Sequence, residues 1–260
     1  MEDIFLSFSL GKFLFLSVAC FTGAFVDAIA GGGGIINVPA FIFTGMPIHY
    51  ALGTNKFSSV FLCLGSSLKY LFSGKINLSL IKYPALISFF ASSLGVYTVS
   101  RIDDKFLEPL VIVLLLFLTV YIISNKKLGF ENTFKVLDRR THTYGLIATF
   151  IISFYIGFFG PGGGSFLLFA YIKIYGFDFV TASANTKVTN LFACLAAVIG
   201  FIILGKVAYL YALPLSVVMF VGGQMGAKFA INNGVKVVRP IFIVVSIITV
   251  SKMILDKFVW

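Results

Sequence analysis

Two glycine-rich interruptions inside long apolar runs constrain this chain more than any other feature. The first, AGGGG, occupies residues 30–34, and the second, GPGGG, occupies residues 160–164. Consecutive glycines, or glycines around a proline, do not sustain a helix. In hydrocarbon, a helix break survives only where protein covers it or where it lines a polar cavity, because its backbone groups find no water. We therefore predict two broken helices whose breaks face one polar chamber at membrane depth.

Composition places the chain in a membrane. Of its 260 residues, 59% are hydrophobic and 12% are charged, whereas charged residues make up about 25% of soluble domains. The formal net charge is +10, but the basic residues are spread over segment ends, where snorkelling and leaflet anchoring explain them. Because a spanning helix needs about 20 apolar residues, we predict an all-α polytopic membrane protein with about eight to ten transmembrane segments.

The second half of the sequence repeats landmarks of the first at a nearly constant offset. Pairs separated by 131 positions are Lys56 and Lys187, Gly95 and Gly226, and Pro109 and Pro240. Internal duplication with glycine-interrupted segments in both halves is typical of a secondary transporter, although a duplicated scaffold that binds nothing is an alternative. We predict two homologous halves: residues 1–124 as the first transmembrane repeat, 125–143 as a cytoplasmic basic linker, and 144–260 as the second repeat.

The orientation of the two halves depends on the short segments that follow the glycine breaks. If these segments cross the membrane, each half has five spans, the repeats are inverted, and both termini lie opposite the linker. If each merges with its predecessor into a single broken span, each half has four spans, and the repeats run parallel. The positive-inside rule places the basic linker in the cytoplasm in either case. We favour the inverted repeat.

A polar turn is expected after each short segment, with the sequence GTNK at residues 53–56 and ANTK at residues 184–187. Lys56 and Lys187 would then lie near helix N-termini, where the helix dipole disfavours a cation, so a compensating anion is expected. Glycine-rich backbone and Asn or Thr donors also suit a small oxyanion. In the alternative, the lysines snorkel to headgroups and the Asn and Thr side chains only cap helices.

The predicted substrate-binding residues come from the two glycine breaks and the two polar turns. They are Gly31, Gly32, Gly33, Gly34, Thr54, Asn55, Lys56, Gly162, Gly163, Gly164, Asn185, Thr186 and Lys187. Asp27 lies inside the first apolar segment, where a carboxylate is costly and is a functional candidate. It could pair with Lys56 or carry a proton coupled to transport. The sequence contains no catalytic constellation or metal-binding motif, so we predict no enzymatic activity, catalytic residue, metal or cofactor.

These motifs carry a resemblance. With DAIAGGGG and GFFGPGGG at the breaks, and GTNK and ANTK after them, the chain resembles the sulfite exporter TauE/SafE family, also called the 4-toluene sulfonate uptake permease family, from residue 10 to 257. The resemblance implies a bacterial plasma-membrane transporter of sulfur-containing anions such as sulfite, sulfoacetate or other organosulfonates. It also implies a binding role for the two breaks and the two Asn/Lys segments. The candidate role of Asp27 does not come from it.

We therefore expect a multi-pass secondary transporter of a small sulfur-containing anion, in which one half of the protein rocks against the other. The alternatives are a passive anion channel, a transporter of another small organic acid, and a scaffold that transports nothing. The expected partners are a small anionic substrate and membrane lipid, with a homodimer left open and no nucleic acid.

Overall fold

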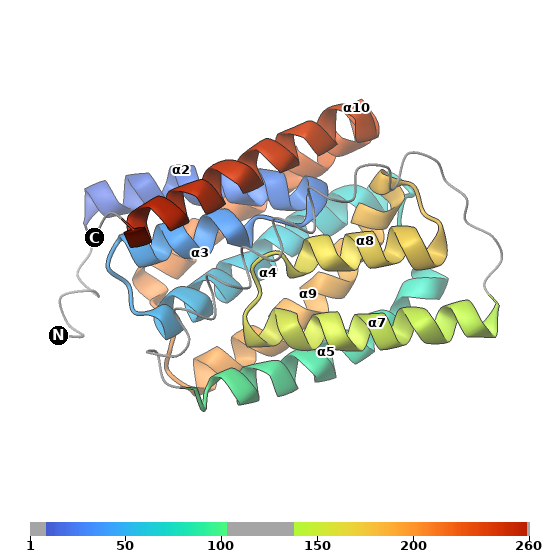
Figure 1. Ribbon diagram of the computed structural model, residues 1–260, viewed down its shortest axis with the longest axis horizontal. Helices are drawn as coiled ribbons and strands as arrows, with labels where there is room; N and C mark the ends of the chain where they lie inside the picture. The colour runs from blue at the N-terminus through green and yellow to red at the C-terminus, as the bar shows by residue number, and fades with distance from the viewer. Residues whose placement is uncertain (1–8, 103–137, 259–260) are drawn as a thin grey trace.

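The structure is a computed structural model that describes residues 9–102 and 138–258, with side chains through residue 234. Every regular element in these ranges is an α-helix (Figure 1). The helices are α2 (Leu10–Ala30), α3 (Gly34–Phe43), α4 (Ile48–Phe72), α5 (Leu78–Val99), α7 (Arg139–Phe158), α8 (Gly163–Tyr175), α9 (Phe179–Ile203) and α10 (Tyr209–Phe258). Helix α10 is kinked at Gly234, where the backbone leaves helical geometry.

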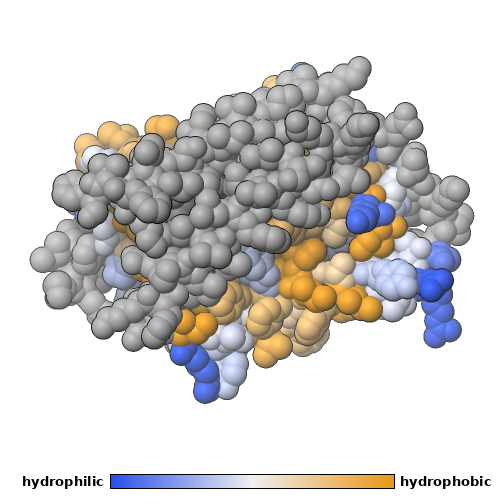
Figure 2. All heavy atoms as spheres, in the orientation of Figure 1, coloured by the Kyte–Doolittle hydropathy of each residue, from blue (hydrophilic) through white to orange (hydrophobic). Residues whose placement is uncertain are grey.

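Five of the described helices are long and apolar enough to cross a membrane: α2, α5, α7, α9 and the Tyr209–Gly234 part of α10. The apolar helices α3 and α8 are shorter, with 10 and 13 residues. In the lower part of Figure 2, where coloured residues are visible, apolar side chains lie in the middle and hydrophilic ones toward both ends, as a bilayer favours. The prediction of an all-α polytopic membrane protein is confirmed.

The predicted linker is described only from residue 138 onward, and the end of the predicted first repeat, from residue 103, lies outside the described residues. Asp138 forms the N-cap of α7, because its side chain accepts the backbone N–H of Thr141 at 2.9 Å. Hydrogen bonds from Thr141 lower the pKa of Asp138 below its usual value. Residues 139–143, which we expected in the linker, are therefore helical.

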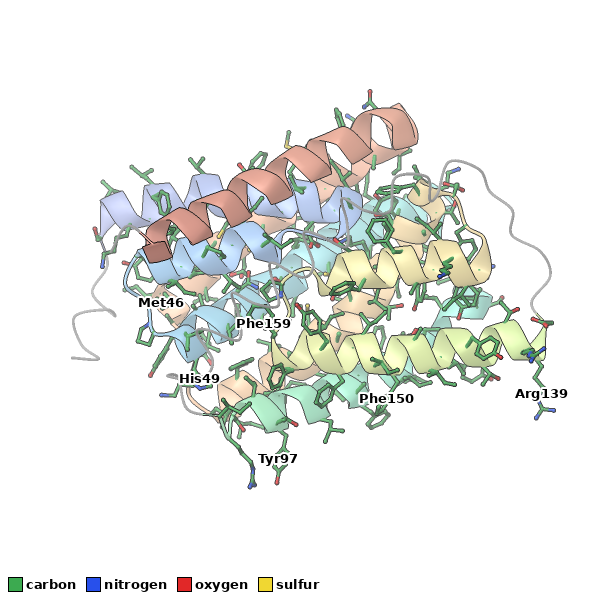
Figure 3. All side chains as sticks on the ribbon, viewed as in Figure 1. Met46, His49, Tyr97, Arg139, Phe150 and Phe159 are labelled. Carbon is green, nitrogen blue, oxygen red and sulfur yellow. The ribbon has the colours of Figure 1, made fainter. Side chains whose placement is uncertain are left out.

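Both glycine-rich stretches break the helix, as predicted. Gly31 follows α2 with a left-handed φ of 81°, and Gly160 and Gly162 follow α7 with φ of 99° and 75°. Glycine adopts this backbone conformation without the steric cost that other residues meet. Figure 3 places Phe159, at the end of α7, near the middle of the molecule and Arg139, at its beginning, at the edge. The second break therefore lies deep in the bundle.

Each short helix turns back along the helix before it. Gly23 of α2 has no room for a Cβ because it lies against the side chain of Asn37 in α3. In the second pair, the hydroxyl oxygens of Thr149 in α7 and Tyr171 in α8 lie 3.1 Å apart. The four-span alternative, in which each short segment continues its predecessor, is therefore wrong. Helices α2 and α7 start from opposite ends of the bundle (Figure 1), as inverted halves require, but the inverted symmetry itself stays a prediction.

The helices of the two predicted halves interleave. Helix α5 packs mainly on α7 and α9, and α10 packs mainly on α2 and α4. Ser88 of α5 donates to the carbonyl of Thr189 at 2.8 Å, and Ser92 donates to the carbonyl of Ala193 at 2.7 Å. Helices α4 and α9 both have 25 residues, and their first residues are 131 positions apart. The division at 1–124 and 144–260 stays a prediction.

Candidate functional site

The two polar segments lie inside helices rather than in turns. Residues 53–56 belong to α4, which begins at Ile48, and residues 184–187 belong to α9. Helix α9 begins earlier than the apolar pattern indicates because Asp178 caps it, accepting the N–H groups of Val180 and Thr181. The predicted turns, the lysines near helix N-termini and the helix-capping alternative are therefore wrong. Hydropathy marked only the apolar parts of these helices and missed polar residues that face protein.

The two glycine breaks touch each other. A Cβ on Gly164 would lie 2.8 Å from the carbonyl oxygen of Gly31, and a Cβ on Gly34 would lie 2.8 Å from Cα of Pro161. Such close backbone contact leaves room only for glycine at these positions. Helices α3 and α8 begin at this contact, and the first N–H groups of a helix have no acceptor within it. The predicted meeting of the two breaks is observed.

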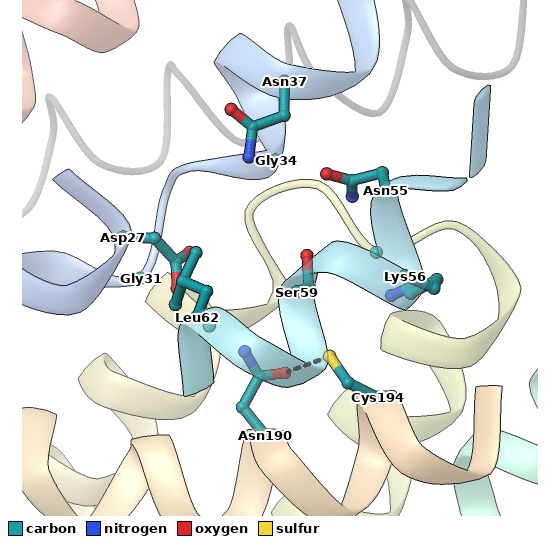
Figure 4. Close-up of a pocket in the computed structure, with 12 residues that line it drawn as sticks. Asp27, Gly31, Gly34, Asn37, Asn55, Lys56, Ser59, Leu62, Asn190 and Cys194 are labelled. Carbon is teal, nitrogen blue, oxygen red and sulfur yellow. Dashed lines mark hydrogen bonds between the residues drawn. The ribbon is translucent and has the colours of Figure 1, made fainter. Parts of the chain in front are cut away.

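A cavity of about 30 Å³ lies beside the contact between the breaks, with room for about two water molecules. Figure 4 shows it with residues contributed by both breaks and by α4 and α9. Its lining residues are Asp27, Gly31, Gly34, Asn37, Asn55, Lys56, Ser59, Leu62, Gly160, Gly164, Asn190 and Cys194. Six of the predicted functional residues are therefore brought together: Asp27, Gly31, Gly34, Asn55, Lys56 and Gly164.

Asp27 forms a buried ion pair with Lys187. The distance from Nζ of Lys187 to Oδ2 of Asp27 is 2.6 Å, and the Lys187 side chain is 0% exposed. The other carboxylate oxygen accepts the backbone N–H of Gly33 at 3.0 Å. The alternative in which Asp27 pairs with Lys56 is wrong, because α9 rather than α4 brings its lysine to the last turn of α2.

Lys56 is also buried but has no carboxylate partner among the described residues. Its ammonium group donates to the carbonyl of Ile156 in α7 and lies so close to Gly160 that a Cβ there would collide with it. When both lysines are protonated and Asp27 is ionised, the site carries two positive charges and one negative charge. A buried cation without a counter-charge is costly. An anion in the cavity would offset that cost.

Two amide side chains in the cavity lack partners. Asn37 is 1% exposed and Asn55 is 4% exposed. Both polar side-chain atoms of Asn37, and Oδ1 of Asn55, form no hydrogen bond with any residue that the structure describes. Because the large majority of buried polar side-chain atoms have a partner, exceptions that line a cavity indicate a polar ligand.

Some predicted residues have structural contacts instead. Thr54 Oγ1 accepts the N–H of Ala208 at 3.0 Å, and Asn185 Oδ1 accepts the N–H of Asn77 at 2.8 Å. These contacts hold the starts of α10 and α5. Thr186 is buried, but it does not line the cavity. Gly32, Gly33, Gly162 and Gly163 shape the breaks without lining the cavity.

Six residues that line the cavity were not among the predicted functional residues: Asn37, Ser59, Leu62, Gly160, Asn190 and Cys194. Cys194 donates to Asn190 Oδ1 at 3.9 Å, and Asn190 Nδ2 donates to Cys63 Sγ at 3.5 Å. Cys63 and Cys194 are 131 positions apart. The repeat offset was therefore a signal that could have placed both thiols at the junction of the two halves.

Helical hairpins that break deep in the bundle, around a cavity with buried charges, define a polytopic membrane transporter. A comparison with protein families agrees with this class. The model of the family described as "Sulfite exporter TauE/SafE" matches residues 15–253. The chain belongs to this family, which confirms the resemblance seen in its motifs.

Three relatives are described as probable membrane transporters. The "Probable membrane transporter protein" of Haemophilus influenzae is 33% identical over 237 residues, which cover 91% of this chain and 92% of the relative. A Sinorhizobium relative, "Probable membrane transporter protein ORF9", is 32% identical and covers 98% of this chain and 96% of its own. "Probable membrane transporter protein YfcA" of Escherichia coli K12 is 32% identical, with 90% and 86% covered. No solved structure gives a significant match.

Proposed function

We propose that the protein is a secondary transporter that carries a small sulfur-containing anion, such as sulfite or an organosulfonate like sulfoacetate, across the bacterial plasma membrane. One observation carries the anion part of this proposal. Lys56 is buried without a counter-ion among the described residues, in a cavity that also holds the unpartnered Nδ2 donor of Asn37. The description of the family supports a sulfur-containing substrate.

The location of the cavity supports a carrier rather than a passive channel. Both helical hairpins contribute to its lining, because Gly31 and Gly34 come from the first break and Gly160 and Gly164 from the second. An anion bound there would contact both hairpins, so movement of one against the other would alter its surroundings. Rocking of this kind around a fixed site is the usual basis of alternating access.

The test is transport by purified protein in proteoliposomes. Lys56→Gln removes the unpaired charge, and Lys75→Gln is the matched control because Lys75 is exposed and lies outside the cavity. We expect Lys56→Gln to reduce saturable sulfite or sulfoacetate uptake about tenfold or more, as the loss of a charged hydrogen bond implies. The control variant should retain uptake and counterflow. Unimpaired uptake by Lys56→Gln would refute the anion site, and uptake without saturation or counterflow would indicate a channel.

A further inference from the structure

The charged groups around the cavity form a small and countable set. Asp27 contacts Lys187 of α9 and interacts electrostatically with Cys194 of α9 and with Lys56, Cys63 and Tyr70 of α4. No second carboxylate lines the cavity or pairs with either lysine within the described parts of the chain. Two protonated lysines and an ionised Asp27 would leave one positive charge at the site.

Asp27 and Lys56 line the same cavity of about 30 Å³. A bound anion therefore lies beside a carboxylate as well as beside an ammonium group. Net charge is strongly disfavoured in a buried site of low dielectric constant. One monoanion neutralises the site as it stands, whereas a dianion leaves an excess negative charge next to Asp27.

We propose that the protonation of Asp27 sets the valence of the anion that the cavity accepts: a monoanion when Asp27 is ionised, and a dianion only together with one proton on Asp27. The inference rests on the proposed function and deepens it. A protonated Asp27 leaves two positive charges, which a dianion neutralises. Transport of dianions is then coupled to protons, and transport of monoanions is not.

The contacts of Asp27 give the proton a defined place. Oδ2, which contacts Nζ of Lys187, takes the proton, and the lysine is released to donate to the dianion. Oδ1 continues to accept the N–H of Gly33, which it accepts in the structure, because the carbonyl oxygen of a carboxylic acid remains an acceptor. The break in the first hairpin therefore keeps its hydrogen bond in both protonation states.

Sulfate and methanesulfonate are suitable probes, because they differ by one methyl group in place of one oxygen. Their charges of minus two and minus one stay constant between about pH 5.5 and about pH 8, so only groups of the protein titrate. Calorimetry in two buffers with different ionisation enthalpies counts the protons taken up with each anion. At about pH 8, we expect about one proton with sulfate and none with methanesulfonate. Because sulfate binds together with one proton, its affinity should fall by about tenfold for each unit of rising pH, while methanesulfonate affinity stays constant.

Two variants fix the charge of the site. Asp27→Asn leaves two positive charges at every pH, so it should bind sulfate without pH dependence. Asp27→Asn combined with Lys187→Gln leaves one, so it should bind methanesulfonate but bind sulfate weakly throughout. If either variant fails to fold, the proton count of the unmodified protein decides the question.

The outcomes separate this inference from the proposed function. If both anions bind with the same pH dependence and the same proton uptake, the valence rule is overturned and the anion site stands. If Asp27→Asn keeps the pH dependence of the unmodified protein, another group titrates and the inference is wrong. If neither anion binds, both the inference and the anion site are overturned.

Discussion

Nζ of Lys187 in α9 lies 2.6 Å from Oδ2 of Asp27 in the last turn of α2. This ion pair joins the first glycine break to a helix that lies far along the chain. Lys56, at the equivalent position of the first half, reaches instead to the last turn of α7 through the carbonyl of Ile156. Each lysine thus contacts the end of the broken helix in the other half, but only one of these ends supplies a carboxylate.

We expect Lys187→Met to destabilise the protein by about 3–5 kcal/mol, because it leaves the carboxylate of Asp27 buried without a counter-ion. Denaturant-induced unfolding in detergent measures the effect. Adding Asp27→Asn to this variant should restore most of the lost stability, since removing both charges of a buried pair is often nearly neutral. A double variant as unstable as Lys187→Met alone would show that the pair does not act as a unit.

Gly31 and Gly74 give a matched pair for the contact between the breaks. Both have left-handed φ values, 81° and 70°, but a Cβ on Gly74 would meet nothing within 4 Å. Gly74→Ala should cost only the left-handed strain, about 1–2 kcal/mol. Gly31→Ala should cost about 1–3 kcal/mol more, because the added methyl group collides with the backbone of Gly164. Equal unfolding free energies for the two variants would contradict the close contact.

The breaks were predictable because glycine runs in apolar segments leave few structural solutions. Their meeting followed from the need to bury polar backbone, and Gly31 and Gly164 confirm it. The ion partner of Asp27 was not predictable, because a sequence offset relates equivalent positions but does not show which residues face each other across the two halves. The polar segment around Lys56 was misjudged because hydropathy does not distinguish a loop from a helix face that packs against protein.

Two asparagines from the predicted site should behave differently. Asn185 accepts the N–H of Asn77 and donates to the carbonyls of Lys75 and Thr181, so Asn185→Ala should lower stability by about 1–3 kcal/mol. Its anion affinity should not change, since Asn185 does not line the cavity.

Asn55→Ala should have the opposite profile. Oδ1 of Asn55 has no partner in the described part of the chain, so truncation removes an unsatisfied group and should cost little stability. The loss of an amide donor to a charged ligand should weaken anion binding about tenfold or more. Unfolding and calorimetry on both variants measure the two effects, and similar profiles for Asn55→Ala and Asn185→Ala would contradict the separation of binding from anchoring.

Cys194 and Cys20 allow the cavity to be probed by chemical modification. Both thiols are free and buried, but only Cys194 lines the cavity. In a Cys20→Ser/Cys63→Ser variant, bound anion should slow the reaction of Cys194 with methyl methanethiosulfonate. Simple competition predicts about tenfold slowing when the anion is present at about ten times its Kd.

In the matched Cys63→Ser/Cys194→Ser variant, the reaction of Cys20 should be unaffected, because the anion does not cover it. Mass spectrometry of the methylthio adduct gives both rates. Equal protection of the two thiols would indicate a general tightening of the protein, and no protection of Cys194 would place the anion elsewhere.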